Sequence, residues 1–151
     1  MSIAADALAD QRIALSSGHS IEDALAILRD SHTDVLPVLD ADGRMEGVFS
    51  LAILMKNLLP VSVPVGGLDI DVRIAAAPGI GKRLAKMQVL RVGDLMDRKA
   101  ASIDPGVPLW EAIGLLMQVG APLFVVDQGT RKLLGMMTYQ SAFDQLSRMK
   151  D

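Results

Sequence analysis

The chain repeats itself, and this repeat restricts its possible folds more than any other feature of the sequence. A shift of 88 positions aligns glycines, helix-core residues and hydroxyl residues of the two halves: Gly18 with Gly106, Ala24 with Ala112, Leu28 with Leu116, Gly47 with Gly135 and Ser50 with Thr138. Between the helix and the next strand the shift is 87, so that Asp40 meets Asp127. Loops tolerate such compensating insertions and deletions. The sequence therefore predicts two copies of one structural unit.

Each copy predicts the same order of elements, β-α-β-β-α. In the first copy, Ser20 is a good helix N-cap with Asp23 three residues later, and apolar residues follow at 21, 24, 25 and 28, on one helical face. The predicted strands are residues 13–15, 35–39 and 46–50, and the closing helix lies near 51–59. The second copy predicts strands at 101–103, 123–126 and 133–138, with helices from 109 and near 139–149.

These elements give a domain plan. We expect an α/β (α+β) fold in which repeat 1 (residues 5–59) and repeat 2 (residues 90–151) form one module with pseudo-twofold symmetry. Residues 60–89 match neither copy, and prolines and glycines interrupt them repeatedly. We interpret this stretch as a connection between the repeats that ends in a short helix near 82–88.

Composition excludes several classes of function. Half of the residues are hydrophobic, only 3% are aromatic and the net charge is −3, so we expect an aliphatic core and no dedicated nucleic-acid binder. The absence of cysteine excludes disulfides, thiol catalysis and thiolate zinc sites. We find no apolar run long enough to span a membrane and no secretory signal, so the expected location is the cytoplasm. No paired catalytic constellation surrounds the two imidazoles, His19 and His32, so we do not expect an enzyme.

Several segments carry a family resemblance. Residues 92–96 (VGDLM) are similar to the segment that opens a cystathionine-β-synthase (CBS) repeat, and residues 36–40 (LPVLD) to its strand and turn. Residues 47–50 (GVFS) and 135–138 (GMMT) are similar to its third strand, which runs from glycine to a hydroxyl residue. The chain as a whole resembles a tandem CBS pair, or Bateman module. That resemblance implies a disc-like regulatory unit with two clefts between the copies, which in this family often bind AMP, ATP or S-adenosylmethionine.

The resemblance also implies a ligand site. The family pattern places a Ser or Thr at the start of the closing helix, where it meets a phosphate, and an Asp three residues later, which binds the ribose. Here the hydroxyls are Ser50 and Thr138, but the Asp is replaced by Ile53 in repeat 1 and by Ser141 in repeat 2. A ligand is therefore expected to prefer the cleft of repeat 2. The candidate ligand-binding residues are Thr138, Ser141, Ser102, Ile103, Val125 and Ser50. Ser50 and Thr138 also suit a purely structural role as helix N-caps.

Three functions remain open from the sequence. The first is a regulatory module that senses an adenosine-containing ligand, needs no cofactor and signals to an unknown protein in trans. The second is a ligand-free homodimerisation module that uses apolar helix faces, with candidate contacts at Leu25, Leu28, Leu54, Leu115, Met117, Phe143 and Leu146. The third, less favoured, is weak nucleic-acid binding through residues 77–99, which resemble a helix-hairpin-helix motif; residues 82–99 carry a net charge of +4.

Overall fold

The start of the first long helix follows directly from its sequence. In the computed structural model, which describes residues 2–10, 13–58 and 79–149, helix α1 runs from Ile21 to Asp30. The Ser20 hydroxyl oxygen accepts a hydrogen bond from the Asp23 backbone N–H at 3.1 Å, which is the predicted cap. Ile21, Ala24 and Leu28 are buried on one face of the helix, as their spacing predicts.

The same order of elements occurs twice. Repeat 1 contains α1, β1 (Val35–Leu39), β2 (Met45–Ser50) and α2 (Leu51–Leu58). Repeat 2 contains β3 (Ser102–Ile103), α6 (Leu109–Val119), β4 (Leu123–Val126), β5 (Leu133–Met137) and α7 (Tyr139–Arg148). Each repeat is preceded by one short turn of helix, η1 (Ala4–Ala7) and α5 (Val92–Leu95). In the predicted connection, α4 (Ile80–Met87) is the expected short helix, and residues 60–78 lie outside the described part of the chain.

The two sheets have matching topology. β3 pairs parallel with β4, which pairs antiparallel with β5. In repeat 1, β1 pairs antiparallel with β2, and a parallel bridge from Leu15 to Val38 takes the place of the first strand. The predicted strand at 13–15 is therefore reduced to a single bridged residue.

Three hydrophobic cores hold these sheets in place. One core packs α1 and α2 on one face of the β1–β2 sheet, and another packs α6 and α7 on one face of the β3–β5 sheet. The third lies between the two sheets and joins Met45 and Val48 of repeat 1 to Phe124, Val126 and Met136 of repeat 2. Because successive side chains of a strand point to opposite faces, each sheet contributes alternate residues to its helix side and to the sheet–sheet contact.

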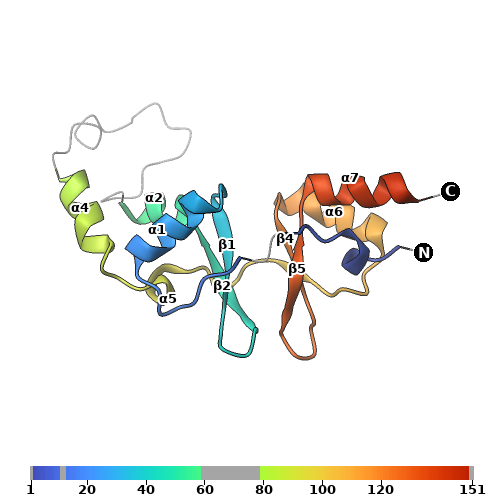
Figure 1. The fold of residues 1–151 in the computed structure, drawn as a ribbon, viewed down its shortest axis with the longest axis horizontal. Helices are drawn as coiled ribbons and strands as arrows, with labels where there is room; N and C mark the ends of the chain where they lie inside the picture. Colours follow the sequence, from blue (N-terminus) through green and yellow to red (C-terminus); the bar gives the residue numbers. More distant parts are fainter. Residues whose placement is uncertain (1, 11–12, 59–78, 150–151) are drawn as a thin grey trace.

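The segment that leads into each repeat packs on the other repeat. Helix η1 lies with α6, α7 and β5, whereas α5 lies beside α1 in repeat 1 (Figure 1). The backbone contacts are equivalent under the shift of 88: the Ala4 N–H donates to the Val107 carbonyl, and the Val92 N–H donates to the His19 carbonyl, both at 2.8 Å. The 92–96 segment thus opens the second repeat in sequence but packs on the first in space.

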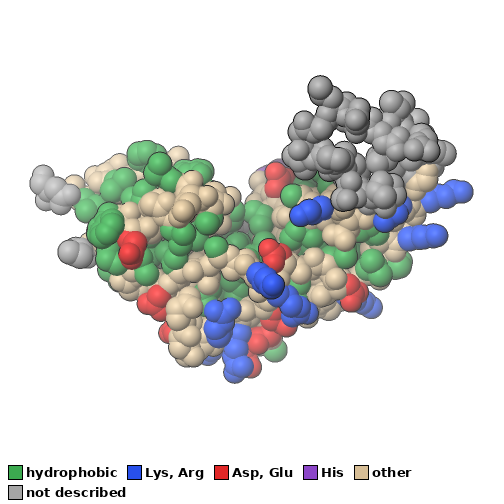
Figure 2. Space-filling view, turned by 180° about the vertical axis from the view of Figure 1, so that it is seen from behind, with side chains coloured by type: hydrophobic (Ala, Val, Ile, Leu, Met, Phe, Trp, Pro, Cys, Tyr) green, Lys and Arg blue, Asp and Glu red, His purple; other side chains and the backbone are tan. Residues whose placement is uncertain are grey.

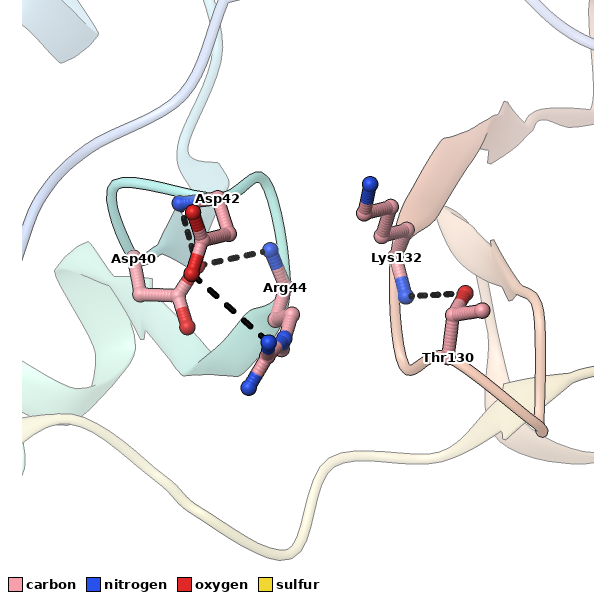
Figure 3. Close-up of polar contacts among 5 residues, drawn as sticks. All are labelled: Asp40, Asp42, Arg44, Thr130 and Lys132. Carbon is pink, nitrogen blue, oxygen red and sulfur yellow. Dashed lines mark hydrogen bonds and ion pairs between the residues drawn. The ribbon is translucent and has the colours of Figure 1, made fainter.

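The hairpins of the two sheets meet at the pseudo-twofold axis. The Met45 N–H donates to the Arg131 carbonyl at 3.0 Å, and the equivalent Leu133 N–H donates to the Gly43 carbonyl at 3.1 Å. Figure 3 shows the facing turns, in which the Asp40 carboxylate accepts a hydrogen bond from the Arg44 N–H at 2.9 Å. This mutual pairing fixes the two repeats relative to each other and confirms the pseudo-twofold module.

Candidate functional site between the repeats

The two hydroxyl residues at the starts of the closing helices act as N-caps. The Ser50 oxygen accepts a hydrogen bond from the Ile53 N–H at 3.1 Å, and the Thr138 oxygen accepts one from the Ser141 N–H at 3.0 Å. Each bond satisfies one of the free N–H groups at a helix start. The N-cap role predicted from the sequence is therefore present in both repeats. An oxygen that already accepts one bond retains its hydroxyl proton as a donor.

Ser141 differs from the aspartate that the family pattern places there. The residue is 7% exposed. Its hydroxyl oxygen accepts a hydrogen bond from the Thr138 N–H at 2.8 Å and donates one to the Thr138 carbonyl at 3.1 Å. With Thr138 it forms a reciprocal capping box. These contacts direct the hydroxyl back to the helix start.

Three pockets lie along β5 and the start of α7, each sharing Met136 or Thr138 with the next, and we call them together the β5 cleft. The largest, about 350 Å³, lies between residues 32–35 of repeat 1 and Pro122, Met136 and Thr138 of repeat 2. The second, about 170 Å³, is lined by Ile13, Ala14 and Pro37 of repeat 1 and residues 133–136 of repeat 2. A group that fills either pocket touches both repeats. From behind, the molecule has a notch between its two lobes (Figure 2).

The third pocket of the β5 cleft, about 280 Å³, is polar and acidic. Asp6, Asp10 and Asp144 line it with Thr138 and Ser141, and Arg148 is its only cation among the described residues. The corresponding positions of repeat 1 carry different charges: Lys56 aligns with Asp144, and Arg98 aligns with Asp10. The sequence reasoning did not identify these carboxylates, although the same shift of 88 would have exposed the contrast.

The structure separates the predicted strand residues from Thr138. Val125 is fully buried in the core under α6 and α7, on the face of β4 opposite the sheet–sheet contact, and Ile103 joins the same core. Ile103 also lines a cavity beside α6 on another side of the repeat. Its neighbour Ser102 is half-buried and pairs with Phe124 in β4. Because β4 is apolar on both faces, its sequence does not show that Val125 faces the helices, where it is buried in the core.

The residues predicted to form dimer contacts differ in burial. Leu28 and Leu54 are buried in the core of repeat 1 and are not available to a partner. Leu25 and Leu115 are partly buried against the helix-side cores. Met117, Phe143 and Leu146 are exposed, and all three belong to repeat 2.

Two other features of the sequence have structural roles. Val92 is fully buried in the core of repeat 1, so the 77–99 segment does not provide a free pair of helices. The His19 ring nitrogen Nδ1 accepts a hydrogen bond from the Ser16 N–H at 2.9 Å in a turn.

Within residues 2–10, 13–58 and 79–149, no helix is long and apolar enough to cross a membrane. Over the same residues, no group of three or more His, Cys, Asp or Glu could hold a metal ion.

A fold of two β-α-β-β-α repeats with a cleft between them defines a CBS pair, and comparison with known families agrees. The family model described as CBS domain matches residues 5–60 and 92–148. The chain therefore belongs to the CBS domain family and contains two CBS domains in tandem, which confirms the resemblance found in the sequence. No curated protein matches the chain significantly.

Solved structures show the same fold at low sequence identity. A CBS domain-containing protein of unknown function from Bacillus anthracis is 17% identical, with a TM-score of 0.73 over 98% of this chain and 94% of that one. CBSX2, a CBS-pair protein from Arabidopsis thaliana, has been solved in complex with AMP and is 23% identical, with a TM-score of 0.71 over 98% of this chain and 100% of that one. A putative acetoin utilization protein from Vibrio cholerae is 17% identical, with a TM-score of 0.70 over 97% and 90% of the two chains.

Proposed function

We propose that this chain is a regulatory, non-catalytic CBS pair that binds an adenosine-containing ligand in the β5 cleft. The observation that carries the proposal is the composition of that cleft. Thr138 and Met136 come from repeat 2, whereas Ile13, Ala14 and Val35 come from repeat 1. A ligand there would change how the two repeats pack, and that change is a signal that a partner protein in the cytoplasm would read. The solved complex of CBSX2 with AMP supports this class of ligand.

The charge of the acidic pocket of the β5 cleft restricts which adenosine-containing ligands would bind. Two unit charges 4 Å apart interact by about 1 kcal/mol even in bulk water, and more strongly near a protein surface. Three carboxylates and one guanidinium therefore disfavour a phosphate group. The same carboxylates accept hydrogen bonds, and Asp144 or Asp10 would serve the ribose in place of the missing family aspartate. We therefore favour adenosine or the cationic S-adenosylmethionine over AMP and ATP.

A heat-shift titration tests the proposal. A ligand that binds only the native state raises the melting temperature by mass action. We expect adenosine and S-adenosylmethionine to raise the melting temperature of the protein and ATP to raise it least. If none of these ligands raises it at millimolar concentration, the ligand-binding proposal is wrong and the ligand-free dimerisation module is the better account.

Matched variants locate the ligand. Asp144→Lys introduces the residue that repeat 1 carries at Lys56, and it should weaken adenosine binding at least tenfold. It should also reduce the difference between the affinities for adenosine and for ATP. Asp42→Lys is the control, because Asp42 lies in the hairpin turn and pairs with Arg44 at 3.6 Å, away from the pockets that border α7. Equal loss of binding in both variants would argue against the acidic pocket as the ribose end.

A further inference from the structure

Helix α4 (Ile80–Met87) lies between the two repeats in sequence and belongs to neither of them. The family model matches residues 5–60 and 92–148, so α4 lies outside both matches. One side of the helix, with Leu84 and Met87, packs on the core of repeat 1. The outward side of α4 makes no such contact, so the CBS fold does not explain which residues it carries.

The outward side of α4 is basic. Residues 79–91 contain four Lys or Arg and no Asp or Glu, although the whole chain has a net charge of −3. Lys82, Arg83 and Lys86 are exposed, and their spacing of three and four residues places them on one helical face. Arg91 is exposed just beyond the helix, where its guanidinium donates to the Gly18 carbonyl at 3.0 Å. Positive charge is therefore concentrated at one end of an acidic protein.

A lysine of helix α2 extends this positive charge. The Arg83 Nε donates to the Asn57 carbonyl at 3.4 Å, and the exposed Lys56 directly precedes Asn57. We call five residues together the α4 basic surface: Lys56, Lys82, Arg83, Lys86 and Arg91. Among the described residues, none of these five side chains forms an ion pair. Lys and Arg side chains lie along the outer end of this lobe in Figure 2.

This arrangement of cations destabilises the helix that carries it. Lys82 and Lys86 are four residues apart, and like charges at that spacing on a helix repel each other. Lys82 also lies in the first turn, where the helix dipole disfavours positive charge and where α4 has no acidic residue. The charges therefore weaken the fold of the isolated chain, and a negatively charged partner would relieve the repulsion.

We propose that the α4 basic surface binds the phosphate backbone of duplex nucleic acid without reading its sequence. A continuous row of phosphates matches cations that are not interspersed with carboxylates. No aromatic residue occurs between residues 50 and 109, so this surface has no platform on which unpaired bases could stack. Leu84 and Met87 already pack on the core of repeat 1, which argues against a helix that inserts its apolar side into a membrane.

The proposed duplex contact is separate from the ligand site. None of the five residues of the α4 basic surface lines a pocket of the β5 cleft. The contact also uses the side chains around one helix and not a pair of helices, since Val92 is buried in the core of repeat 1. Duplex binding and adenosine binding can therefore fail independently of each other.

Fluorescence anisotropy of a labelled DNA duplex of arbitrary sequence, titrated with the full chain at several salt concentrations, tests the proposal. Each phosphate that a protein neutralises contributes about −0.9 to the slope of log affinity against log salt concentration. With three to five contacts the slope should lie between about −3 and −4.5, so the affinity should fall at least about fortyfold between 50 and 200 mM salt. A single strand of the same length should bind more weakly than the duplex.

Two double variants with the same change of charge locate the contact. Lys82→Gln with Lys86→Gln should weaken duplex binding at least tenfold at low salt and make the salt slope less steep by about 2. Arg29→Gln with Lys132→Gln is the control, because these exposed residues lie near the end of α1 and in the hairpin of repeat 2. It should leave the affinity and the slope unchanged. Both proteins should melt close to the wild type, since all four side chains are exposed.

Three results would overturn the proposal. The first is no duplex binding by the wild type at 50 mM salt. The second is binding to vesicles of phosphatidylserine without binding to the duplex, which would make a membrane surface the partner of α4. The third is an equal loss of duplex affinity in the two double variants, which would show that net charge and not the α4 basic surface determines binding.

Discussion

The two repeats share their backbone contacts and differ in the residues that they present outward. Under the shift of 88, the contacts of the leading segments and hairpins and the caps of the closing helices are matched by equivalent hydrogen bonds. The outward face of the first long helix and the pocket at the start of the closing helix are not equivalent: charged positions of α1 are apolar in α6, and Lys56 becomes Asp144. The shared backbone contacts therefore maintain the fold, while the changes of charge at these outward positions give each repeat a different surface.

The largest effect is expected in the core, where the repeats should respond alike. Leu28 and Leu116 are equivalent, and each is 1% exposed. Leu28→Ala and Leu116→Ala should each lower the free energy of unfolding by about 2–5 kcal/mol, since both leave a cavity. Urea unfolding of the two variants measures this cost. Costs that differ by more than about 2 kcal/mol would show that the helix-side cores are not equivalent.

The glycines that begin the matching third-strand segments should respond differently. A Cβ on Gly47 would lie 2.6 Å from the Asp97 carbonyl oxygen, whereas a Cβ on Gly135 would lie 3.2 Å from a methyl carbon of Leu8. Backbone cannot move aside as a leucine side chain can, so Gly47→Ala should cost about 1–3 kcal/mol. Gly135→Ala should cost less than about 1 kcal/mol. Unfolding of the two proteins in parallel tests this difference, and a reversed order would contradict it.

The two helix caps should have small and similar effects on stability but different effects on ligand binding. Ser50→Ala and Thr138→Ala each remove one cap bond and should each cost about 1 kcal/mol. Thr138 lines two pockets of the β5 cleft and Ser50 lines none of its three pockets, so only Thr138→Ala should reduce the heat shift caused by adenosine. A heat shift that falls equally in both variants would place the ligand elsewhere.

Most helices and strands could be predicted from the sequence because its two copies can be aligned with each other. The positions of Ser20, Leu28 and Thr138 in their elements follow from caps and helical spacing. The exchange of leading segments could not be predicted, because the shift shows that η1 matches α5 and does not show which repeat either one contacts. Contacts between distant segments reveal the exchange, such as the hydrogen bonds from the Ala4 N–H to the Val107 carbonyl and from the Val92 N–H to the His19 carbonyl.

The candidate site could be predicted only in part. The caps follow from the pattern of glycine and hydroxyl residues, whereas the orientation of Val125 does not follow from a strand of four apolar residues. The carboxylates of Asp6 and Asp10 reach the start of α7 from a distant part of the sequence, through the contact of the Ala9 N–H with the Met136 carbonyl at 2.8 Å. Local sequence patterns contain no information about such a contact.

Binding by two reciprocal variants at one pair of equivalent positions tests most directly whether the repeats share a framework but differ in what their surfaces bind. Lys56 belongs to the α4 basic surface, and Asp144, which aligns with it under the shift of 88, lines the acidic pocket of the β5 cleft. Lys56→Asp should weaken duplex binding and leave the heat shift caused by adenosine unchanged. Asp144→Lys should reduce that heat shift without weakening duplex binding. Loss of both interactions in each variant, or loss of the opposite interaction, would contradict the account.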